Sequence, residues 1–458
     1  MSLTWRRFQG FCTVYCLLVA LSACSQGISS TPLSTPTTRP SATATSGQAA
    51  VVQTCPAQAT ARGAVMPSMT AGNHPNIVYL SQEVNSSILQ RYDITTASTR
   101  TILQTNATGV IQEANVSPDG QWVLFTSKMQ DQFAIQLIRM DGQQLQTLYC
   151  TPSQMSIDAA LLSPDQHSLV FNQVNQDESM STLYLLDMTT GKLQTELSPQ
   201  QPNYPGIAQG QRQTSWLSLS SSSSSRDKAI DIPEVHPLPG THYLIYIPLK
   251  WASNRSVYLL GTLRGSGTPP HQLALLRDIS KDGTHQQNNL QPISAAAEYN
   301  ECAMMPDNRQ LVCSLYTPMG PGGPSAIEMQ PITAGSASRS VYRSPTGGML
   351  VTRALSNSTL IFILNKSGSP ASLWKINTDG SGLTRLMAAK TTDAILNFAY
   401  YSYLPWSTIS PDGTLYAIEV SSISGNTQSL LFGHLNGDTP TTIAANAHVF
   451  TLIGWSQL

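Results

Sequence analysis

A short motif recurs between residues 76 and 458, and this repeat constrains the fold more than any other feature of the chain. In Asn115–Phe125 two apolar stretches are joined through Ser, Pro, Asp and Gly. Further copies lie at 162–171, around Pro306–Asp307, at 409–413 and, in degenerate form, at Pro239–Gly240 before Tyr243–Tyr246. Proline presets the turn dihedral, Asp accepts hydrogen bonds from its own backbone, and Gly tolerates positive φ. Each copy therefore predicts a turn between two strands.

A second pair of apolar stretches, joined by a polar turn, follows each copy. We identify seven such hairpins, at Ile88–Leu103, Ile135–Leu148, Leu183–Leu193, Leu273–Gln291, Ile327–Tyr342, Leu373–Leu386 and Leu430–Ile443. Two hairpins form one four-stranded antiparallel sheet, and such sheets repeated every roughly 40–50 residues are typical of propeller blades. The sequence therefore predicts an all-β fold, a β-propeller of seven blades. Six or eight blades stay open, because Asn357 stands where other copies have Pro and Asp.

The two ends of the repeat region complement each other. Ile77–Leu80 fits the second strand of a first blade that has no innermost strand, whereas Val449–Trp455 has no partner left in its own blade. A propeller ring closes when one blade is built from both chain ends. We therefore expect the C-terminal strand to complete the first blade.

Two segments resemble the repeats of TolB-like and related WD-type propellers. They are Ser117–Phe125, with its Pro-Asp-Gly turn, and Trp374–Leu386, with its Thr-Asp-Gly-Ser-Gly turn. The resemblance spans nearly the whole repeat region and implies the propeller fold, because its motifs specify turns and strands. The chain departs from TolB in having a lipobox, no recognisable domain ahead of the propeller, and more than six blades.

The N-terminus has the pattern of a bacterial lipoprotein signal. Arg6 and Arg7 precede an apolar run, Phe11–Leu21, which is short for a membrane span and typical of a signal-peptide core. Leu21–Cys24 then resembles a lipobox. This predicts a signal peptide at 1–23, diacylglycerol on Cys24, and a protein anchored by lipid on the extracytoplasmic side of the cell membrane. An ordinary secretory signal with a chance cysteine is the alternative.

Two stretches lack a hydrophobic period. Residues 24–70 are rich in Ser, Thr, Pro and Ala, so we expect a disordered stalk ahead of a propeller at 71–458. A low-complexity insertion is expected near 199–233, which includes the serine run at 218–225. The chain has 25 basic and 26 acidic residues, and it shows no basic footprint for nucleic acid.

Four cysteines follow Cys24. Cys302 and Cys313 occupy the positions four before and seven after Pro306, where other blades have a small residue opposite a large one. We expect a cross-strand disulfide there, with two buried thiols as the alternative. Whether Cys55 in the stalk pairs with Cys150 stays open.

The sequence contains no familiar catalytic or metal-binding motif. The histidines are scattered, and His236 and His242 have no third ligand at a suitable spacing. The recurring Asp119, Asp165 and Asp307 are explained by turn chemistry. We therefore expect no catalytic residue, no metal and no cofactor. The expected function is a non-catalytic binding or scaffold head for a protein, peptide or cell-wall glycan; a propeller lyase, glycosidase or quinoprotein-like dehydrogenase with a site in the central channel is the alternative.

Overall fold

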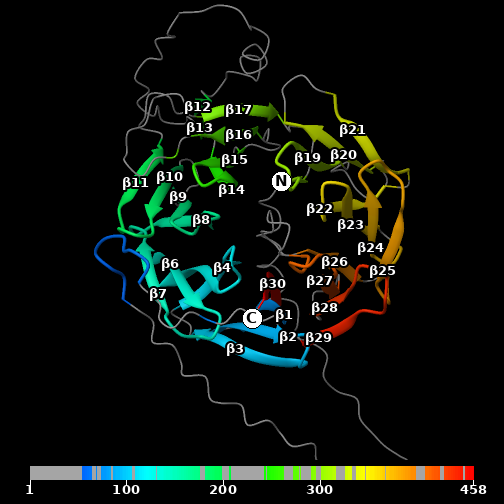
Figure 1. The fold of residues 1–458 in the computed structure, drawn as a ribbon, viewed down its shortest axis with the longest axis horizontal. Helices are drawn as coiled ribbons and strands as arrows, with labels where there is room; N and C mark the ends of the chain where they lie inside the picture. Colours follow the sequence, from blue (N-terminus) through cyan, green and yellow to red (C-terminus); the bar gives the residue numbers. More distant parts are fainter. Residues whose placement is uncertain are drawn as a thin grey trace, which may run out of the picture.

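Seven four-stranded antiparallel sheets stand around a central axis as the blades of a propeller (Figure 1). The structure, a computed structural model, describes residues 54–63, 69 and 74–457, with gaps of which the longest are 199–205, 208–241, 263–271, 280–289, 316–324 and 399–407. The described residues contain no helix, and hence none that is long and apolar enough to cross a membrane. The predicted all-β, seven-bladed fold is confirmed.

Each blade runs outwards from an innermost strand. Blades 1 to 4 consist of β30 (Val449–Gln457), β1 (Pro75–Glu83), β2 (Ser86–Asp93) and β3 (Ser98–Thr105); β4 (Gly109–Val116), β5 (Trp122–Met129), β6 (Gln132–Arg139) and β7 (Gln146–Cys150); β8 (Met155–Leu162), β9 (Ser168–Asn175), β10 (Ser181–Asp187) and β11 (Leu193–Leu197); and β14 (Ile245–Ser253), β15 (Ser256–Thr262), β16 (Gln272–Leu276) and β17 (Leu290–Ala295).

Blades 5 to 7 consist of β18 (Glu301–Met304), β19 (Gln310–Leu315), β20 (Ser325–Pro331) and β21 (Arg339–Ser344); β22 (Met349–Ala354), β23 (Thr359–Asn365), β24 (Ser372–Asn377) and β25 (Thr384–Ala388); and β26 (Ala394–Asn397), β27 (Leu415–Ser422), β28 (Gln428–His434) and β29 (Thr441–Asn446). A two-stranded sheet of β12 (Gly206–Ile207) and β13 (His242–Tyr243) precedes blade 4. The rest of the predicted insertion at 199–233 lies outside the described residues.

The C-terminal strand closes the ring, as predicted. β30 pairs antiparallel with β1 and is the innermost strand of blade 1. Trp455, 1% exposed, packs in a cluster that joins blades 7 and 1. Side chains of blade 7 also bind the backbone of β30: Gln428 pairs with Phe450 through both amide atoms, and Glu419 accepts a hydrogen bond from Leu452 N at 2.6 Å. Blade 7 is therefore fastened to blade 1 by polar as well as apolar contacts.

The recurring acidic turns are built as their sequence predicts. In blade 2, Asp119 accepts hydrogen bonds from Ser117 Oγ and Gln121 N, and Ser117 Oγ accepts one from Trp122 N. Blades 3 and 7 repeat this arrangement around Asp165 and Asp412. The residue after each Asp has positive φ, for which Gly120, at +70°, is the least strained choice. The aspartates thus stabilise the turns from the first to the second strand.

The degenerate copy in blade 4 was assigned wrongly from the sequence. Pro239–Gly240 precedes the innermost strand β14, whereas the turn from β14 to β15 contains Asn254. Asn254 Oδ1 accepts a hydrogen bond from Asp165 N of blade 3, and Asn357 of blade 6 binds Asp307 N of blade 5 in the same way. In blades 4 and 6 an asparagine that bonds to the preceding blade thus replaces the Pro-Asp turn.

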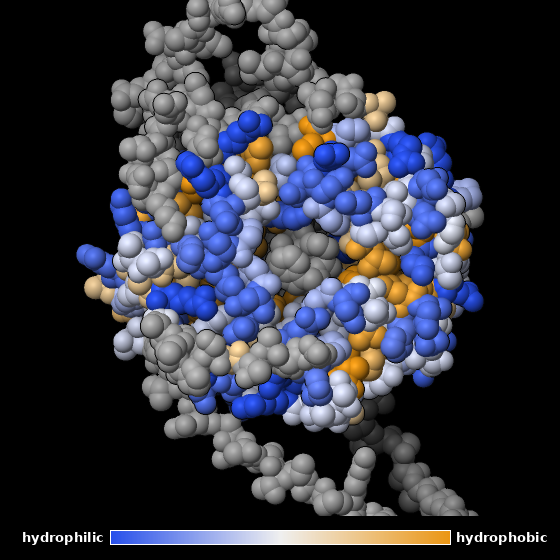
Figure 2. Space-filling view, viewed as in Figure 1, coloured by the Kyte–Doolittle hydropathy of each residue, from blue (hydrophilic) through white to orange (hydrophobic). Residues whose placement is uncertain are grey.

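Apolar side chains fill the spaces between neighbouring blades. One cluster joins blades 2 and 3 through Trp122, Leu124 and Phe171, and similar clusters join the other blades. The face shown in Figure 2 is largely hydrophilic, with hydrophobic surface gathered over blade 6. The core is therefore divided into seams between the blades.

Candidate functional site

The segment Thr54–Gly63, here called the strap, lies along the seam between blades 2 and 3. Cys55 forms a disulfide with Cys150 at the end of β7, with the two Cα atoms 5.8 Å apart. Thr60 N donates to Leu148 O and Arg62 N donates to Met188 O, both at 2.8 Å. The strap thus bonds to blade 2 and to blade 3.

Two small residues allow this close fit. Ala59 packs against the apolar cluster that joins blades 2 and 3. Gly191, in the turn from β10 to β11, faces the strap backbone so closely that a Cβ there would lie 2.6 Å from Ala61 N. The sequence placed residues 24–70 in a disordered stalk, and this is wrong for Thr54–Gly63, because the disulfide and backbone hydrogen bonds hold these ten residues on the propeller.

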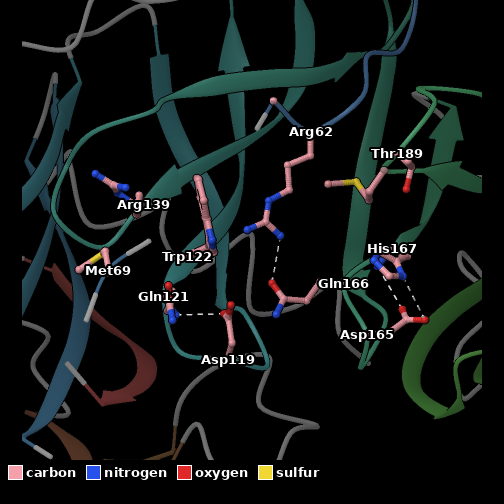
Figure 3. A pocket seen from close by; sticks show the side chains of 12 residues that line it. Arg62, Met69, Asp119, Gln121, Trp122, Arg139, Asp165, Gln166, His167 and Thr189 are labelled. Atoms are coloured by element: carbon pink, nitrogen blue, oxygen red, sulfur yellow. Dashed lines mark hydrogen bonds and ion pairs between the residues drawn. The ribbon is translucent and has the colours of Figure 1, made fainter. Parts of the chain in front are cut away.

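The strap completes a pocket between blades 2 and 3, here called the strap pocket (Figure 3). Its volume is about 560 Å³. Two acidic turns form opposite walls, one from blade 2 and one from blade 3, and the strap lies across them. The lining residues are Arg62, Gly63, Met69, Asp119, Gln121, Trp122, Arg139, Asp165, Gln166, His167, Met188 and Thr189.

Arg62 extends from the strap between the two walls (Figure 3). Its guanidinium lies 4.3 Å from the ring centroid of Trp122, and its Nη1 donates to Gln166 Oε1 at 3.1 Å. Burial lowers the pKa of Arg62, and the nearby Asp119 carboxylate opposes this effect. Arginine stays charged even so. Arg62 therefore brings a positive charge into the pocket and covers the face of a buried tryptophan.

Groups of both charges surround Arg62. Asp119 and Asp165 are exposed on the acidic turns, and His167 Nδ1 lies 3.7 Å from Asp165 Oδ2. Arg139 forms an ion pair with Asp141 at 2.6 Å. Partial burial acts to raise the pKa of Asp141, but hydrogen bonds from Arg139 and from Gln143 N lower it overall. The pocket thus presents fixed donors and acceptors without a strong net charge, which suits a polar ligand.

A second, apolar pocket of about 250 Å³ lies at the inner strands of blades 2, 3 and 4. We call it the inner pocket. It is lined by Asn115, Val116, Pro118, Leu124, Leu161, Leu162, Pro164, Lys250 and Trp251. Burial lowers the pKa of Lys250, whereas the exposed Asp307 of blade 5 acts to raise it. The two acidic turns contribute to both pockets, so a short distance separates an apolar pocket from a polar one.

Two buried carboxyls lie outside both pockets. Burial raises the pKa of Glu419, on β27, and that of Glu196, on β11, to about 8. A hydrogen bond from Leu452 N to Glu419 opposes the rise. Glu419 supports the closing strand, so we assign it to ring closure. Among the described residues no group of three or more His, Cys, Asp and Glu side chains is placed to hold a metal ion.

The structure brings together only some of the cysteines singled out in the sequence. Cys302 of β18 stands opposite Cys313 of β19 in register, and Cys313, fully buried, is disulfide-bonded. The side chain of Cys302 lies outside the described residues, so the pairing stays a prediction. Cys24, the predicted lipidation site, also lies outside them, as do residues 1–23. The open question about Cys55 is resolved in favour of pairing with Cys150.

Sequence reasoning missed most of the strap pocket. It singled out Asp119 and Asp165 as turn residues, which they are, but not as neighbours across a seam. It also missed Arg62, because nothing in the composition of residues 24–70 sets this residue apart from a disordered stalk. The signal that was present is Cys55, whose pairing with Cys150 draws the segment onto blade 2.

No protein-family model and no curated protein matches the sequence. Similar solved structures include TolB from Acinetobacter baumannii, with 14% identity and a TM-score of 0.39 over 69% of this chain. The match spans 64% of the TolB chain. The β-propeller domain of the Trilobed protease from Pyrococcus furiosus has 9% identity and a TM-score of 0.48, over 82% of this chain and 95% of that one.

The periplasmic gluconolactonase from Pseudomonas aeruginosa has 12% identity and a TM-score of 0.45, over 82% of this chain and 99% of the enzyme. At such identities the likeness concerns the fold alone.

Proposed function

We propose that this chain is an exported, lipid-anchored binding protein that holds a protein, peptide or cell-wall glycan at the strap pocket without converting it chemically. The strap pocket is the observation that carries the proposal. Its polar groups are fixed in place by a rigid scaffold, as Arg62 is by Trp122 and Gln166, and Asp119 is by its own turn. Pre-organised groups of this kind favour binding because little ordering is left to be done.

The balance of groups in the pocket supports binding more than catalysis. Its carboxylates, Asp119 and Asp165, are exposed and accept hydrogen bonds from their own turns. A general acid or base is commonly tuned by burial, and the carboxyls with strongly raised pKa values, Glu196 and Glu419, lie elsewhere. The enzyme alternative places its site in the central channel.

The Cys55–Cys150 disulfide supports export, because structural disulfides persist in oxidising compartments. Thirty residues, 25–54, separate Cys55 from the proposed lipid on Cys24. A disordered segment of that length has an r.m.s. end-to-end distance of about 30 Å. In the proposed arrangement the tether therefore reaches the propeller at blade 2, beside the binding site, and not at the first strand of blade 1.

A blocking substitution tests the binding site. Thr189 is exposed and lines the strap pocket, and its neighbour Thr190 is exposed in the same turn outside the lining. We expect Thr189→Arg to reduce partner capture from native envelopes at least tenfold, because the long side chain enters the pocket. Thr190→Arg is the matched control and should capture as the unaltered protein does. Equal capture by both variants would remove the strap pocket from the proposal.

Mass spectrometry of the protein from its native host tests the anchor, with a diacylglycerol-bearing N-terminus at Cys24 expected. A chain that starts at Met1, or that is cut elsewhere, contradicts it. A screen of ester, peptide, glycoside and quinone-linked sugar oxidation substrates is expected to show no turnover. Activity that survives Thr189→Arg but is lost when a charged residue of an inner strand is replaced would support the enzyme alternative.

A further inference from the structure

The inner pocket has the features of a second binding site, independent of the strap pocket. It lies where three neighbouring blades meet, at the ends of β4 and β8 and against β14. These are the innermost strands of their blades (Figure 1), so the pocket lies on the axial side of the ring. Val116, Leu161 and Leu162 form apolar walls.

The polar donors of two lining residues already have partners. Trp251 Nε1 donates to Leu161 O at 3.2 Å, and Asn115 Nδ2 donates to Ala160 O at 3.4 Å. An occupant is therefore not needed to satisfy these groups. Because their hydrogen bonds also fix the indole and the amide in place, the apolar walls are held open as a formed cavity.

Lys250 is the exception. It is half-buried in the lining, and this burial lowers its pKa because the charged form loses part of its hydration. Asp307 is near enough to act on this charge but is itself exposed on a turn of blade 5. Within the described part of the chain, Lys250 forms no ion pair. A partly desolvated ammonium beside an apolar cavity favours a ligand that supplies a negative charge at that edge.

We propose that the inner pocket binds the C-terminal residue of a partner polypeptide, with an apolar side chain in the cavity and the free carboxylate on Lys250. The volume of about 250 Å³ exceeds that of an engineered apolar cavity of about 150 Å³ that binds benzene. It therefore accommodates one apolar side chain with its carboxylate. The inference does not depend on the function proposed for the strap pocket.

Calorimetric titration of the purified protein with N-acetylphenylalanine and with its uncharged amide tests the proposal. The acid is expected to bind at least tenfold more tightly than the amide. A tetrapeptide that ends in phenylalanine should bind at least as tightly as the single residue, whereas octanoate should bind more weakly. Tighter binding of octanoate than of the peptide would overturn the polypeptide as the ligand, and no binding of the acid at millimolar concentration would overturn the site.

Lys250→Met removes the charge but keeps an unbranched side chain, and it should abolish the preference for acid over amide. Lys250→Arg should retain the preference, which guards against misreading a variant that folds poorly. Lys192→Met is the matched control, since Lys192 is exposed and lies outside the lining, and it should bind as the unaltered protein does. An unchanged preference in Lys250→Met would overturn the role of Lys250.

Discussion

Two segments, β30 and the strap, join the propeller outside the regular order of the blades, and they are held in different ways. β30 pairs with β1 over eight residue positions and buries Trp455 and Leu452 between blades 7 and 1. The strap is held by a disulfide, by backbone hydrogen bonds and by the contacts that Ala59 and Arg62 make with blades 2 and 3. The first segment completes the fold, whereas the second completes a pocket on a fold already formed.

This contrast predicts the largest effect for removal of β30. Deleting residues 449–458 leaves the inner edge of β1 unpaired and removes the apolar contacts at the closing seam, so we expect aggregation or loss of the cooperative melting transition. Trp455→Ala should be milder and cost about 3–5 kcal/mol of unfolding free energy. Size-exclusion chromatography and calorimetry measure both effects.

Removal of residue 458 alone is the control, because it leaves β30 whole, and its melting temperature should match that of the full chain. A soluble protein that lacks 449–458 and melts normally would show that β30 is as dispensable to the fold as the strap. The distinction between β30 and the strap would then fail.

The role of β30 could be predicted from the sequence and that of the strap could not, for a physical reason. Val449–Trp455 is an apolar run without a partner in its own blade, and the turn chemistry around Pro118 and Pro411 shows where each blade begins. These local patterns fix strands, turns and closure. Contacts between blades follow from tertiary packing, so the approach of Arg62 to Gln166, 104 residues apart, has no local signal.

The error in blade 4 has the same origin. Pro239–Gly240 has suitable turn residues, but the two-strand turn of that blade uses Asn254, which bonds to Asp165 N of blade 3. Asn357, which left the number of blades open in the sequence, accepts the equivalent hydrogen bond from Asp307 N of blade 5. In both blades an asparagine stands in place of the Pro-Asp motif and accepts a hydrogen bond from the preceding blade.

The closing seam should respond to pH in a way that the strap does not. Glu419 has a pKa of about 8 in the folded protein and about 4.5 in the unfolded chain, so folding takes up a proton between these values. Its stabilising effect is complete below pH 4.5 and is lost as the pH rises to 8. The loss amounts to up to about 5 kcal/mol, at 1.36 kcal/mol for each pKa unit.

Glu419→Gln tests this, because the amide oxygen still accepts the hydrogen bond from Leu452 N but does not titrate. Relative to the unaltered protein, the variant should gain unfolding free energy steadily from pH 5 to pH 8, as followed by urea denaturation. The buried Glu196, whose pKa is also about 8, leaves part of the pH dependence in place. Exposed Glu83→Gln is the control. Parallel pH profiles for Glu419→Gln and the unaltered protein would remove Glu419 from ring closure.

The smallest expected effect on the fold comes from freeing the strap. The double substitution Cys55→Ser and Cys150→Ser removes a cross-link between residues 95 apart in sequence, and such losses typically cost about 2–4 kcal/mol. We expect the propeller to stay folded, because β30 and all seven blades are untouched. Without the disulfide, the strap is held only by its hydrogen bonds and by the contacts of Ala59 and Arg62. The amides of Thr60 and Arg62 should then exchange with solvent at least tenfold faster, while that of Leu452 keeps its protection. Cys313→Ser is the matched control, since Cys313 of blade 5 is also disulfide-bonded and its loss should leave the exchange of Thr60 and Arg62 unchanged. Retained protection of Thr60 and Arg62 in the double variant would mean that the strap holds by itself and is as much a part of the fold as β30.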